Sequence, residues 1–168
     1  MPLYDRSAAV AYAVKYAIAP NPDYPPYPND CTSFVSQAMF AGGWTMVGGS
    51  FGDRKDDEAW WWGKSFFTKA SYTWGGAHNF SKFADKSGRG TICPRSDLAV
   101  GDVVQIAKNG HVFHSMIVTA LMCSTDGDGP HMSYHTNNTL HKYLGTIEAS
   151  YPSSDGYSFL YWKIAKSF

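Results

Sequence analysis

Long hydrophobic runs are missing from this chain. None of its stretches approaches the ~18 consecutive apolar residues that a membrane-spanning helix needs. The N-terminus, MPLYDRSAAV, also lacks the charged segment and following apolar stretch of a signal peptide. We therefore expect no membrane span, and the sequence by itself predicts a protein that stays in the compartment where it is made.

An excess of charge of either sign is missing too, because 14 basic residues balance 14 acidic ones. A neutral chain has no electrostatic footprint for nucleic acid or for an anionic membrane surface, so we expect neither partner. The 168 residues, 44% of them hydrophobic and 16% aromatic, instead predict one folded domain over residues 1–168, acting as a monomer. The aromatic content favours a binding groove or an extended core.

Cysteine is scarce, with three residues in the whole chain. Three thiols allow at most one disulfide, so one thiol must stay free. If Cys31 is reserved for chemistry, Cys93 and Cys123 are the pair left to form a disulfide. The odd cysteine is therefore the first candidate for a reactive group.

The first third of the chain has the pattern of helices. An alanine-rich segment predicts a helix over residues 6–18, with Asp5 as its N-cap. Five prolines at positions 20–28 exclude regular helix and central strand from the connection that follows. A second helix is expected to begin directly after this connection.

The second helix places a cysteine at its first turn. Cys31 starts the helical pattern, Asp30 is the expected N-cap, and Gly42 with Gly43 marks the end. A further short helix is expected over residues 77–85, within a glycine-rich and aromatic region.

The second half of the chain changes to the pattern of strands. Alternating or continuous apolar segments separated by hairpin-type turns such as KNG and STDGDG predict β-structure. Helices followed by an antiparallel meander indicate an α+β fold. The expected strands cover residues 102–107, 112–122, 131–137, 144–149 and 157–165.

Cys31 has two interpretations. The unpaired N–H groups and positive end of the dipole at a helix N-terminus favour a thiolate, which is the nucleophilic form. The alternative is an inert buried thiol, because Cys31 also lies on the apolar face of its helix, and buried cysteines are common. A nearby base is needed to decide between them.

His114 is the candidate base. A strand period of two puts His111 and His114 on opposite faces, so only one of them can face the cysteine. His114 shares its face with apolar residues and is expected to point inward, whereas His111 follows an Asn-Gly turn and is expected to be exposed. A histidine satisfied within the core is the alternative.

The next strand supplies candidates for a third polar group. His131, Ser133, His135 and Asn137 alternate along SYHTN and its neighbours, so they lie on one face. His135 and Asn137 can then lie beside the strand of His114. A polar group bonded to the second ring nitrogen of a base fixes its tautomer and stabilises the imidazolium.

Two other functions use the same residues. Cys31, His114 and His135 are competent zinc ligands, although the chain has neither a C-x-x-C pair nor an H-E-x-x-H motif. A catalytically silent module that binds glycan or peptide in an aromatic groove is the other alternative.

The order of these residues resembles the papain-like cysteine peptidases. More narrowly, the chain resembles the bacterial putative amidase domain family, which is related to the CHAP and NlpC-type cell-wall hydrolases. The segments that carry the resemblance span nearly the whole chain: YDRSAAVAYAVKYA (4–17), NDCTSFVSQAMFAGG (29–43), LAVGDVVQ (98–105), HSMIVT (114–119), SYHTNNTL (133–140) and YWKI (161–164).

The resemblance implies a papain-like α+β fold, with N-terminal helices packed on an antiparallel sheet, and a thiol-dependent amidase or endopeptidase that needs no cofactor or metal. Cys31 is then the nucleophile and His114 the general base and acid, with His135, and next Asn137, orienting the imidazole. The backbone N–H of Cys31 is the expected oxyanion donor, assisted by Asn29 or Asp30.

The implied substrate is peptidoglycan or its peptides, and members of the family are usually exported. The resemblance therefore predicts a secreted or cell-wall associated enzyme, whereas the N-terminal sequence, which lacks a signal segment, predicts the opposite. A block of aromatic residues is the candidate wall of a substrate groove, with packing between the two halves of the fold as its alternative. The block consists of Trp60, Trp61, Trp62, Tyr72 and Trp74.

Overall fold

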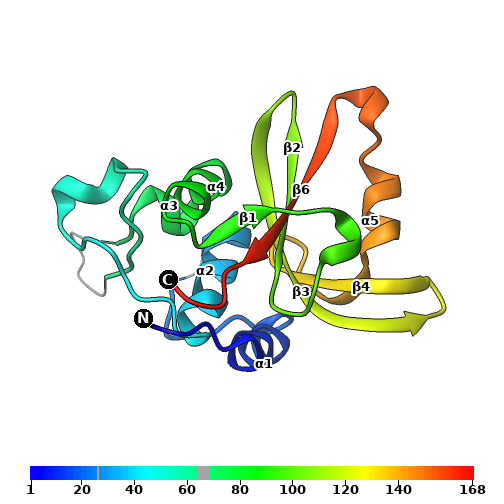
Figure 1. The fold of residues 1–168 in the computed structure, drawn as a ribbon, viewed down its shortest axis with the longest axis horizontal. Helices are drawn as coiled ribbons and strands as arrows, with labels where there is room; N and C mark the ends of the chain where they lie inside the picture. The colour runs from blue at the N-terminus through cyan, green and yellow to red at the C-terminus, as the bar shows by residue number, and fades with distance from the viewer. Residues whose placement is uncertain (26, 64–68) are drawn as a thin grey trace.

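The computed structural model describes residues 1–25, 27–63 and 69–168. Pro26, one of the prolines of the 20–28 connection, and residues 64–68 lie outside this part. Four α-helices come first and a fifth lies between the last strands (Figure 1). The helices are α1 (Arg6–Tyr16), α2 (Cys31–Ala41), α3 (Tyr72–Gly75), α4 (Ala77–Lys86) and α5 (Leu144–Ser150). Three short 3-10 helices cover Phe51–Lys55, Arg95–Asp97 and Ser153–Asp155.

Six strands form one sheet with the order β1-β6-β2-β3-β4-β5. Every neighbouring pair is antiparallel, so the α+β class and the antiparallel sheet are confirmed. The strands are β1 (Gly90–Ile92), β2 (Val103–Lys108), β3 (His111–Ser124), β4 (Gly127–Tyr134), β5 (Thr139–Tyr143) and β6 (Tyr157–Ile164).

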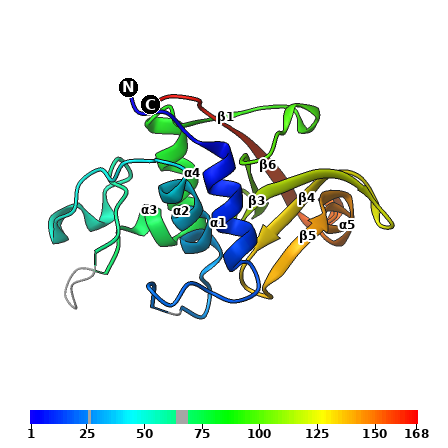
Figure 2. The same ribbon diagram turned by 90° about the horizontal axis from the view of Figure 1, so that it is seen from below.

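The sheet is covered on both faces. Helices α1 to α4 gather on one side and α5 lies on the other, as Figure 2 shows. The core between α1–α4 and the sheet contains most of the buried aromatic rings, including Phe34, Trp44, Trp60, Trp74, Phe80 and Phe83. A second core packs α5 against the opposite face through Val104, Ile106, Met116, Met132, Leu144 and Ile147.

The helix starts follow the sequence. The Asp5 carboxylate accepts a hydrogen bond of 2.9 Å from the Ala8 N–H, which confirms it as the N-cap of α1. Helix α2 begins at Cys31, as predicted, and ends at Ala41 before Gly42. A side chain at Gly42 would meet the Tyr4 ring at 2.5 Å, so glycine is required there for the end of α2 to approach the N-terminal segment.

The prediction of a strand over residues 144–149 is wrong, because this segment forms helix α5. Leu144 and Ile147 are both buried against the sheet, and their spacing of three places them on one side of a helix. The segment is too short for its period to be evident in the sequence. Strands β1 and β5 and helix α3 were not predicted.

The predicted strand over 131–137 ends early. Strand β4 stops at Tyr134, and His135 and Asn137 lie in the turn that leads to β5. Thr136 and Asn137 both have positive φ, of 61° and 70°, which is the conformation of a tight hairpin turn. The alternation of a strand therefore no longer applies to these side chains.

Helix α2 is buried on all sides, although the sequence predicts only one apolar face. All residues from Cys31 to Met39 are buried. Its polar side chains are satisfied inside the core: Ser36 donates to the Trp74 carbonyl at 2.8 Å, and Gln37 accepts from the Tyr12 hydroxyl at 2.8 Å. These bonds remove the cost of burying polar groups.

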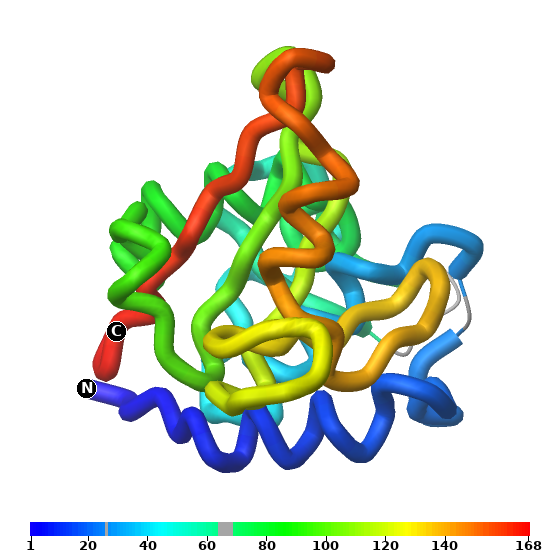
Figure 3. The backbone as a smooth tube through the Cα atoms, turned by 90° about the vertical axis from the view of Figure 1, so that its right-hand side faces the viewer, coloured from blue at the N-terminus to red at the C-terminus, as the bar shows by residue number. Residues whose placement is uncertain are grey.

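The two ends of the chain lie side by side (Figure 3). The Tyr4 N–H donates to the Lys166 carbonyl at 2.9 Å. Close by, Arg6 at the start of α1 donates to the buried Asp102 carboxylate at 2.6 Å. Among the residues described, no helix is both long and apolar enough to cross a membrane.

Candidate active site

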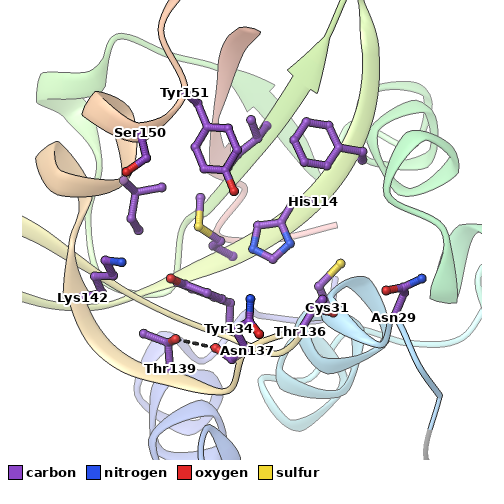
Figure 4. A pocket seen from close by; sticks show the side chains of 14 residues that line it. Asn29, Cys31, His114, Tyr134, Thr136, Asn137, Thr139, Lys142, Ser150 and Tyr151 are labelled. Carbon is purple, nitrogen blue, oxygen red and sulfur yellow. Dashed lines mark hydrogen bonds between the residues drawn. The ribbon is translucent and has the colours of Figure 1, made fainter.

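A cavity of about 590 Å³ opens where the N-terminus of α2 meets β3, the β4–β5 turn and α5 (Figure 4). We call it the main pocket. Both Cys31 and His114 line it, so the structure brings the predicted nucleophile and the predicted base to one site. The other lining residues are Asn29, Ile106, Phe113, Met116, Tyr134, Thr136, Asn137, Thr139, Lys142, Ile147, Ser150 and Tyr151.

One hydrogen bond joins the two elements that carry these groups. The Thr32 and Ser115 hydroxyls are 2.9 Å apart, and both side chains are fully buried. Thr32 follows Cys31 and Ser115 follows His114 in the chain. The bond therefore fixes the first turn of α2 against β3 next to both reactive residues, while Ser115 also accepts from the Gln105 amide at 2.9 Å.

The Cys31 thiol lies at the edge of the main pocket. Only 5% of the residue is exposed, and in Figure 4 its sulfur points toward the pocket. Its backbone N–H is at the first position of the helix, where no intrahelical acceptor exists. Cys31 thus combines limited access with the electrostatics of a helix N-terminus.

The other two cysteines do not form the expected disulfide. Cys93, which follows β1, and Cys123, near the end of β3, are both free. Burial raises the pKa of the Cys93 thiol, and the hydrogen bond to the Asp128 carboxylate raises that of Cys123. Neither environment favours a thiolate.

His114 is inward-pointing and half-buried, whereas His111 is exposed, as the strand period predicts. Burial lowers the pKa of His114 to about 4, so its imidazole is neutral at pH 7 and can accept a proton. The Tyr134 ring contacts it edge-on with centroids 5.1 Å apart. No hydrogen bond links the ring to Cys31 or to any other residue in the described ranges; catalytic hydrogen bonds often form only once substrate is bound.

Asn137 follows β4 and lines the main pocket together with His114. Its amide lies below the imidazole in Figure 4, and both residues line the main pocket. The positive φ of Thr136 and Asn137 turns this part of the hairpin toward the pocket. Of the two residues predicted to orient His114, Asn137 lines the pocket that contains His114, and His135 does not.

His135 is buried elsewhere, and the structure does not bring it to His114. Its Nδ1 is 2.6 Å from the Asp30 carboxylate and its Nε2 is 2.8 Å from the Tyr16 carbonyl. Because β4 ends at Tyr134, the side chain of His135 turns toward the helices. The same contact engages Asp30, whose carboxylate makes no capping bond to α2.

Asn29 is the better placed of the two predicted oxyanion helpers. It is exposed and lines the main pocket, a cavity of about 360 Å³ that Cys31 also lines, and a third cavity of about 290 Å³. Its amide can donate a hydrogen bond to a developing oxyanion. The Asp30 carboxylate cannot do so, because an ionised carboxylate only accepts.

The tryptophan block mostly belongs to the core. Trp60 and Trp61 are fully buried, which matches the packing interpretation. Trp74 is buried too, with one edge toward the cavity of about 290 Å³, and Trp62 packs against Tyr24 with centroids 4.5 Å apart. Tyr72 is 41% exposed at that cavity, so it is the member of the block best placed for a ligand.

The ligands that a zinc site would need do not converge. Cys31 and His114 share the main pocket, but His135 is bound to Asp30 and Tyr16. Within the described residues, no group of three or more His, Cys, Asp or Glu side chains is arranged to hold a metal ion.

Several residues of the site were missed in the sequence. Thr32 and Ser115 carry a weak signal, because each directly follows a predicted reactive residue. Lys142 and Tyr151 carry none, since they reach the main pocket only through the turn to β5 and the unpredicted helix α5.

The sequence of the chain is similar to a known protein family and to two curated proteins. Residues 3–159 match the family described as "Putative amidase domain". The chain is similar to the uncharacterized protein YhbB of Bacillus subtilis (strain 168), with 30% identity over 165 residues that cover 94% of this chain and 50% of that protein. The chain thus spans about half the length of this relative.

A shorter similarity is found to the uncharacterized protein YjcM of the same organism. It is 55% identical over 40 residues, which cover 23% of this chain and 10% of that protein. No solved structure matches the chain.

Proposed function

Since the chain belongs to the family described as "Putative amidase domain", we propose that it is a cysteine-dependent hydrolase of amide bonds with a papain-like fold. The family supports amide hydrolysis. The observation that supports thiol dependence is the shared pocket of Cys31, at the first residue of α2, and His114 on β3.

In the proposed mechanism the Cys31 thiol transfers its proton to the neutral His114 imidazole. The sulfur attacks the carbonyl carbon of the amide, and His114 then gives the proton to the leaving nitrogen as the C–N bond breaks. A water molecule, deprotonated by His114, attacks the thioester and releases the acid. Cys31 recovers its proton and the cycle closes.

Two groups assist these steps. The backbone N–H of Cys31 and the Asn29 amide donate to the oxyanion of the tetrahedral intermediate. Asn137 orients His114 and stabilises its protonated form, taking the role first expected of His135. Phe113 and Tyr151 flank the pocket and supply apolar walls for substrate.

The proposed substrate is a peptide of the bacterial cell wall, cleaved as an amidase or endopeptidase outside the cell membrane. Support comes from the resemblance to cell-wall hydrolases and from the two cavities that Cys31 lines, of about 590 and 360 Å³, which suit an extended chain crossing the thiol.

Thiol dependence is tested with iodoacetamide and mass analysis of each cysteine. We expect Cys31 to be alkylated well below pH 8, faster than Cys93 and Cys123, because only Cys31 lies at a helix N-terminus. Alkylation of Cys31 only after unfolding would favour the silent binding module.

The substrate is tested by digesting purified peptidoglycan and analysing the fragments by mass. We expect new amino termini with the wild-type protein and none with Cys31→Ala, while His114→Ala loses nearly as much activity as Cys31→Ala. Unchanged fragments together with turnover of a small amide would reject the cell-wall substrate and keep the cysteine chemistry.

A further inference from the structure

We propose that a cavity which shares Asn29 with the main pocket binds a carboxylate of the substrate chain through Arg54. The inference rests on the proposed function and deepens it, because it adds a second subsite for the same substrate. The cavity is the one of about 290 Å³ that Tyr72 and Trp74 also line, and we call it the Arg54 cavity. Arg54 is the one charged side chain among the described residues that line it.

The guanidinium of Arg54 is held in place by two contacts. Its Nε–H donates to the Ala70 carbonyl at 3.2 Å, and its central carbon lies 5.4 Å from the centroid of the Tyr72 ring. The first contact uses the inner N–H and leaves the two terminal nitrogens for another acceptor. These nitrogens form the fork that binds both oxygens of a carboxylate. A guanidinium that is already positioned loses less entropy on binding than a flexible one.

No carboxylate of the described residues pairs with Arg54, although its own segment is acidic. The Asp53 carboxylate accepts from the Ser50 N–H at 3.2 Å and so caps the 3-10 helix that carries Arg54. The Asp57 carboxylate lies 3.4 Å from the Lys82 ammonium. Within the described residues both acids are thus engaged elsewhere, and a ligand carboxylate would supply the counter-charge of Arg54.

Ser33 adds a fixed hydrogen-bond donor to the same cavity. It lines the Arg54 cavity from α2, and only 3% of it is exposed. Its hydroxyl oxygen accepts from the Gln37 amide and from the Trp74 indole N–H, both at 3.2 Å. A hydroxyl has two lone pairs and one hydrogen, so these bonds leave the hydrogen to be donated. An oxygen of a bound carboxylate is an acceptor for it.

The Arg54 cavity adjoins the cavities that Cys31 lines. Asn29 lines all three, and Gly75 lines the Arg54 cavity together with the one of about 360 Å³. A Cβ at Gly75 would have no atom within 4 Å, so the space next to this glycine is open. A substrate chain that crosses the thiol can therefore continue past Gly75 and place a carboxylate at Arg54.

The test measures binding to Cys31→Ala, which cannot cleave the probes by the proposed mechanism. The probes are acetyl-tetraalanine with a free carboxylate, its C-terminal amide, and an amidated acetyl-trialanyl-glutamate with its carboxylate on a side chain. NMR titration follows the Trp74 indole N–H, which lies in the cavity wall. We expect at least one acid to bind about fivefold more tightly than the amide, and the tighter acid identifies the source of the carboxylate.

Arg54→Gln should bind the acids and the amide equally, because the charge is lost. Lys55→Gln is the matched control, since it removes the same charge from the next position of the same 3-10 helix at an exposed residue outside the cavity lining. It should keep the preference for an acid. Lys142→Gln should keep it too, which separates this subsite from the cation of the main pocket.

Gly75→Leu should weaken the binding of all three probes at least fivefold, because its side chain fills the open space beside the cavity. Gly52→Leu is the control. A Cβ at Gly52 also has room, with the Ser50 hydroxyl as its nearest atom at 3.5 Å, and Gly52 does not line the Arg54 cavity. It should bind all probes as the parent does.

Equal affinity for the acids and the amide, including no binding of any probe, would overturn the proposal. An equal weakening of acids and amide by Arg54→Gln would do the same, and would leave Arg54 as a structural contact of Ala70 and Tyr72. Because binding is measured without turnover, neither result affects the assignment of Cys31 as nucleophile. A failed alkylation test of Cys31 would likewise leave the binding result standing.

Discussion

His114 is a half-buried base held in its neutral form. Desolvation lowers its pKa from the ordinary value of 6.5 to about 4, so the folded state resists protonation in this range. A neutral imidazole suits the first step of the proposed mechanism, and the thiolate formed in that step would in turn stabilise the imidazolium.

The lowered pKa of His114 makes the protein sensitive to acid. Between pH 6.5 and 4 the unfolded chain binds more protons at this site than the folded one, so the free energy of unfolding falls as the pH falls. Between pH 7 and pH 4 the free energy of unfolding of the wild type should fall because of His114. In His114→Gln we expect this fall to be smaller by up to about 3 kcal/mol. Urea denaturation at both pH values measures this difference. His111→Gln, the exposed neighbour on β3, is the control and should keep the wild-type loss.

Thr136 carries strain at the edge of the main pocket. Its φ of 61° is uncommon for a β-branched residue, and its hydroxyl is buried with no partner in the described residues. The β2–β3 turn uses Asn109 and Gly110 at similar φ values, 50° and 80°, which are the residues preferred there. A β-branched residue with positive φ in the lining of the main pocket indicates a functional role for Thr136.

Replacing Thr136 by Asn should relieve this strain. We expect a gain of about 1 kcal/mol, or roughly 3 °C in Tm, because Asn tolerates positive φ. Activity should fall, since the longer amide side chain changes the lining of the main pocket. Thermal denaturation and the peptidoglycan assay measure the two effects. A lower Tm would show that Thr136 is not strained.

Among the elements, those with long patterns or clear end signals were predictable. Helix α2 starts at Cys31 and ends at Ala41, directly before the predicted stop at Gly42. Strands β2, β3 and β6 lie within a few residues of their predicted ranges. Helix α5 was not predictable, because seven residues give too little periodicity and its identity is decided by packing on the sheet. Tertiary burial overrides local preference in such short segments.

The site was predictable where it depends on a helix start and a strand period. These signals predicted that Cys31 lies at the first turn of α2 and that His114 points inward. They failed at His135 because the end of β4 is set by the turn at Thr136 and Asn137, and the turn sequence HTNN contains no glycine that would mark a hairpin. The Thr32 to Ser115 contact depends on how α2 packs on β3, which no local pattern encodes.

The Thr32 to Ser115 bond should hold the nucleophile and the base in register. We expect Ser115→Ala to destabilise the fold by about 1–2 kcal/mol, because the Thr32 hydroxyl loses a buried partner, and to lower kcat more than it changes KM. Urea denaturation and amide hydrolysis kinetics measure both. Ser36→Ala is the control. It removes a buried hydroxyl from α2, the helix of Thr32, at a position that does not line the main pocket. Ser36→Ala should lower the free energy of unfolding by a similar amount and leave kcat nearly unchanged. An equal loss of kcat in Ser36→Ala and Ser115→Ala would contradict the positioning role of the Thr32 to Ser115 bond.

At the scale of the whole molecule, Asp102 joins the two ends of the chain to the sheet. Its buried carboxylate accepts from Arg6 of α1 at 2.6 Å, from the Ile164 N–H of β6 at 3.0 Å, and from the Ala99 N–H at 2.9 Å. Lys163 lies 3.2 Å away. One side chain thus connects the helical half with two segments of the strand half.

Removing the Asp102 carboxylate should destabilise the whole fold. We expect Asp102→Ala to cost about 3–5 kcal/mol, because it removes the carboxylate that balances the Arg6 charge and leaves the Ile164 and Ala99 N–H groups without their acceptor. Asp57→Ala is the control, since its ion pairs with Lys82 and Lys86 are at the surface and are worth at most about 1 kcal/mol. Urea denaturation of both variants tests the difference, and similar losses would contradict the role of Asp102.

The charge of the main pocket predicts which substrates it prefers. Among the described residues that line it, Lys142 is the one permanently charged side chain, and none of them carries a carboxylate. The molecule is neutral as a whole, so this local charge is not part of a general basic surface. A substrate with a carboxylate near the scissile amide should therefore bind better than its amidated form.

We expect Lys142→Gln to raise KM about fivefold for a peptide substrate with a free carboxylate and to leave kcat nearly unchanged, because Lys142 contributes to binding and not to the chemical step. The same peptide with its carboxylate amidated should show no change in KM. Lys86→Gln, on the exposed face of α4, serves as the control for a simple loss of positive charge. A rise in KM that is equal for both peptides would show that Lys142 supports the shape of the pocket and does not recognise a negative charge.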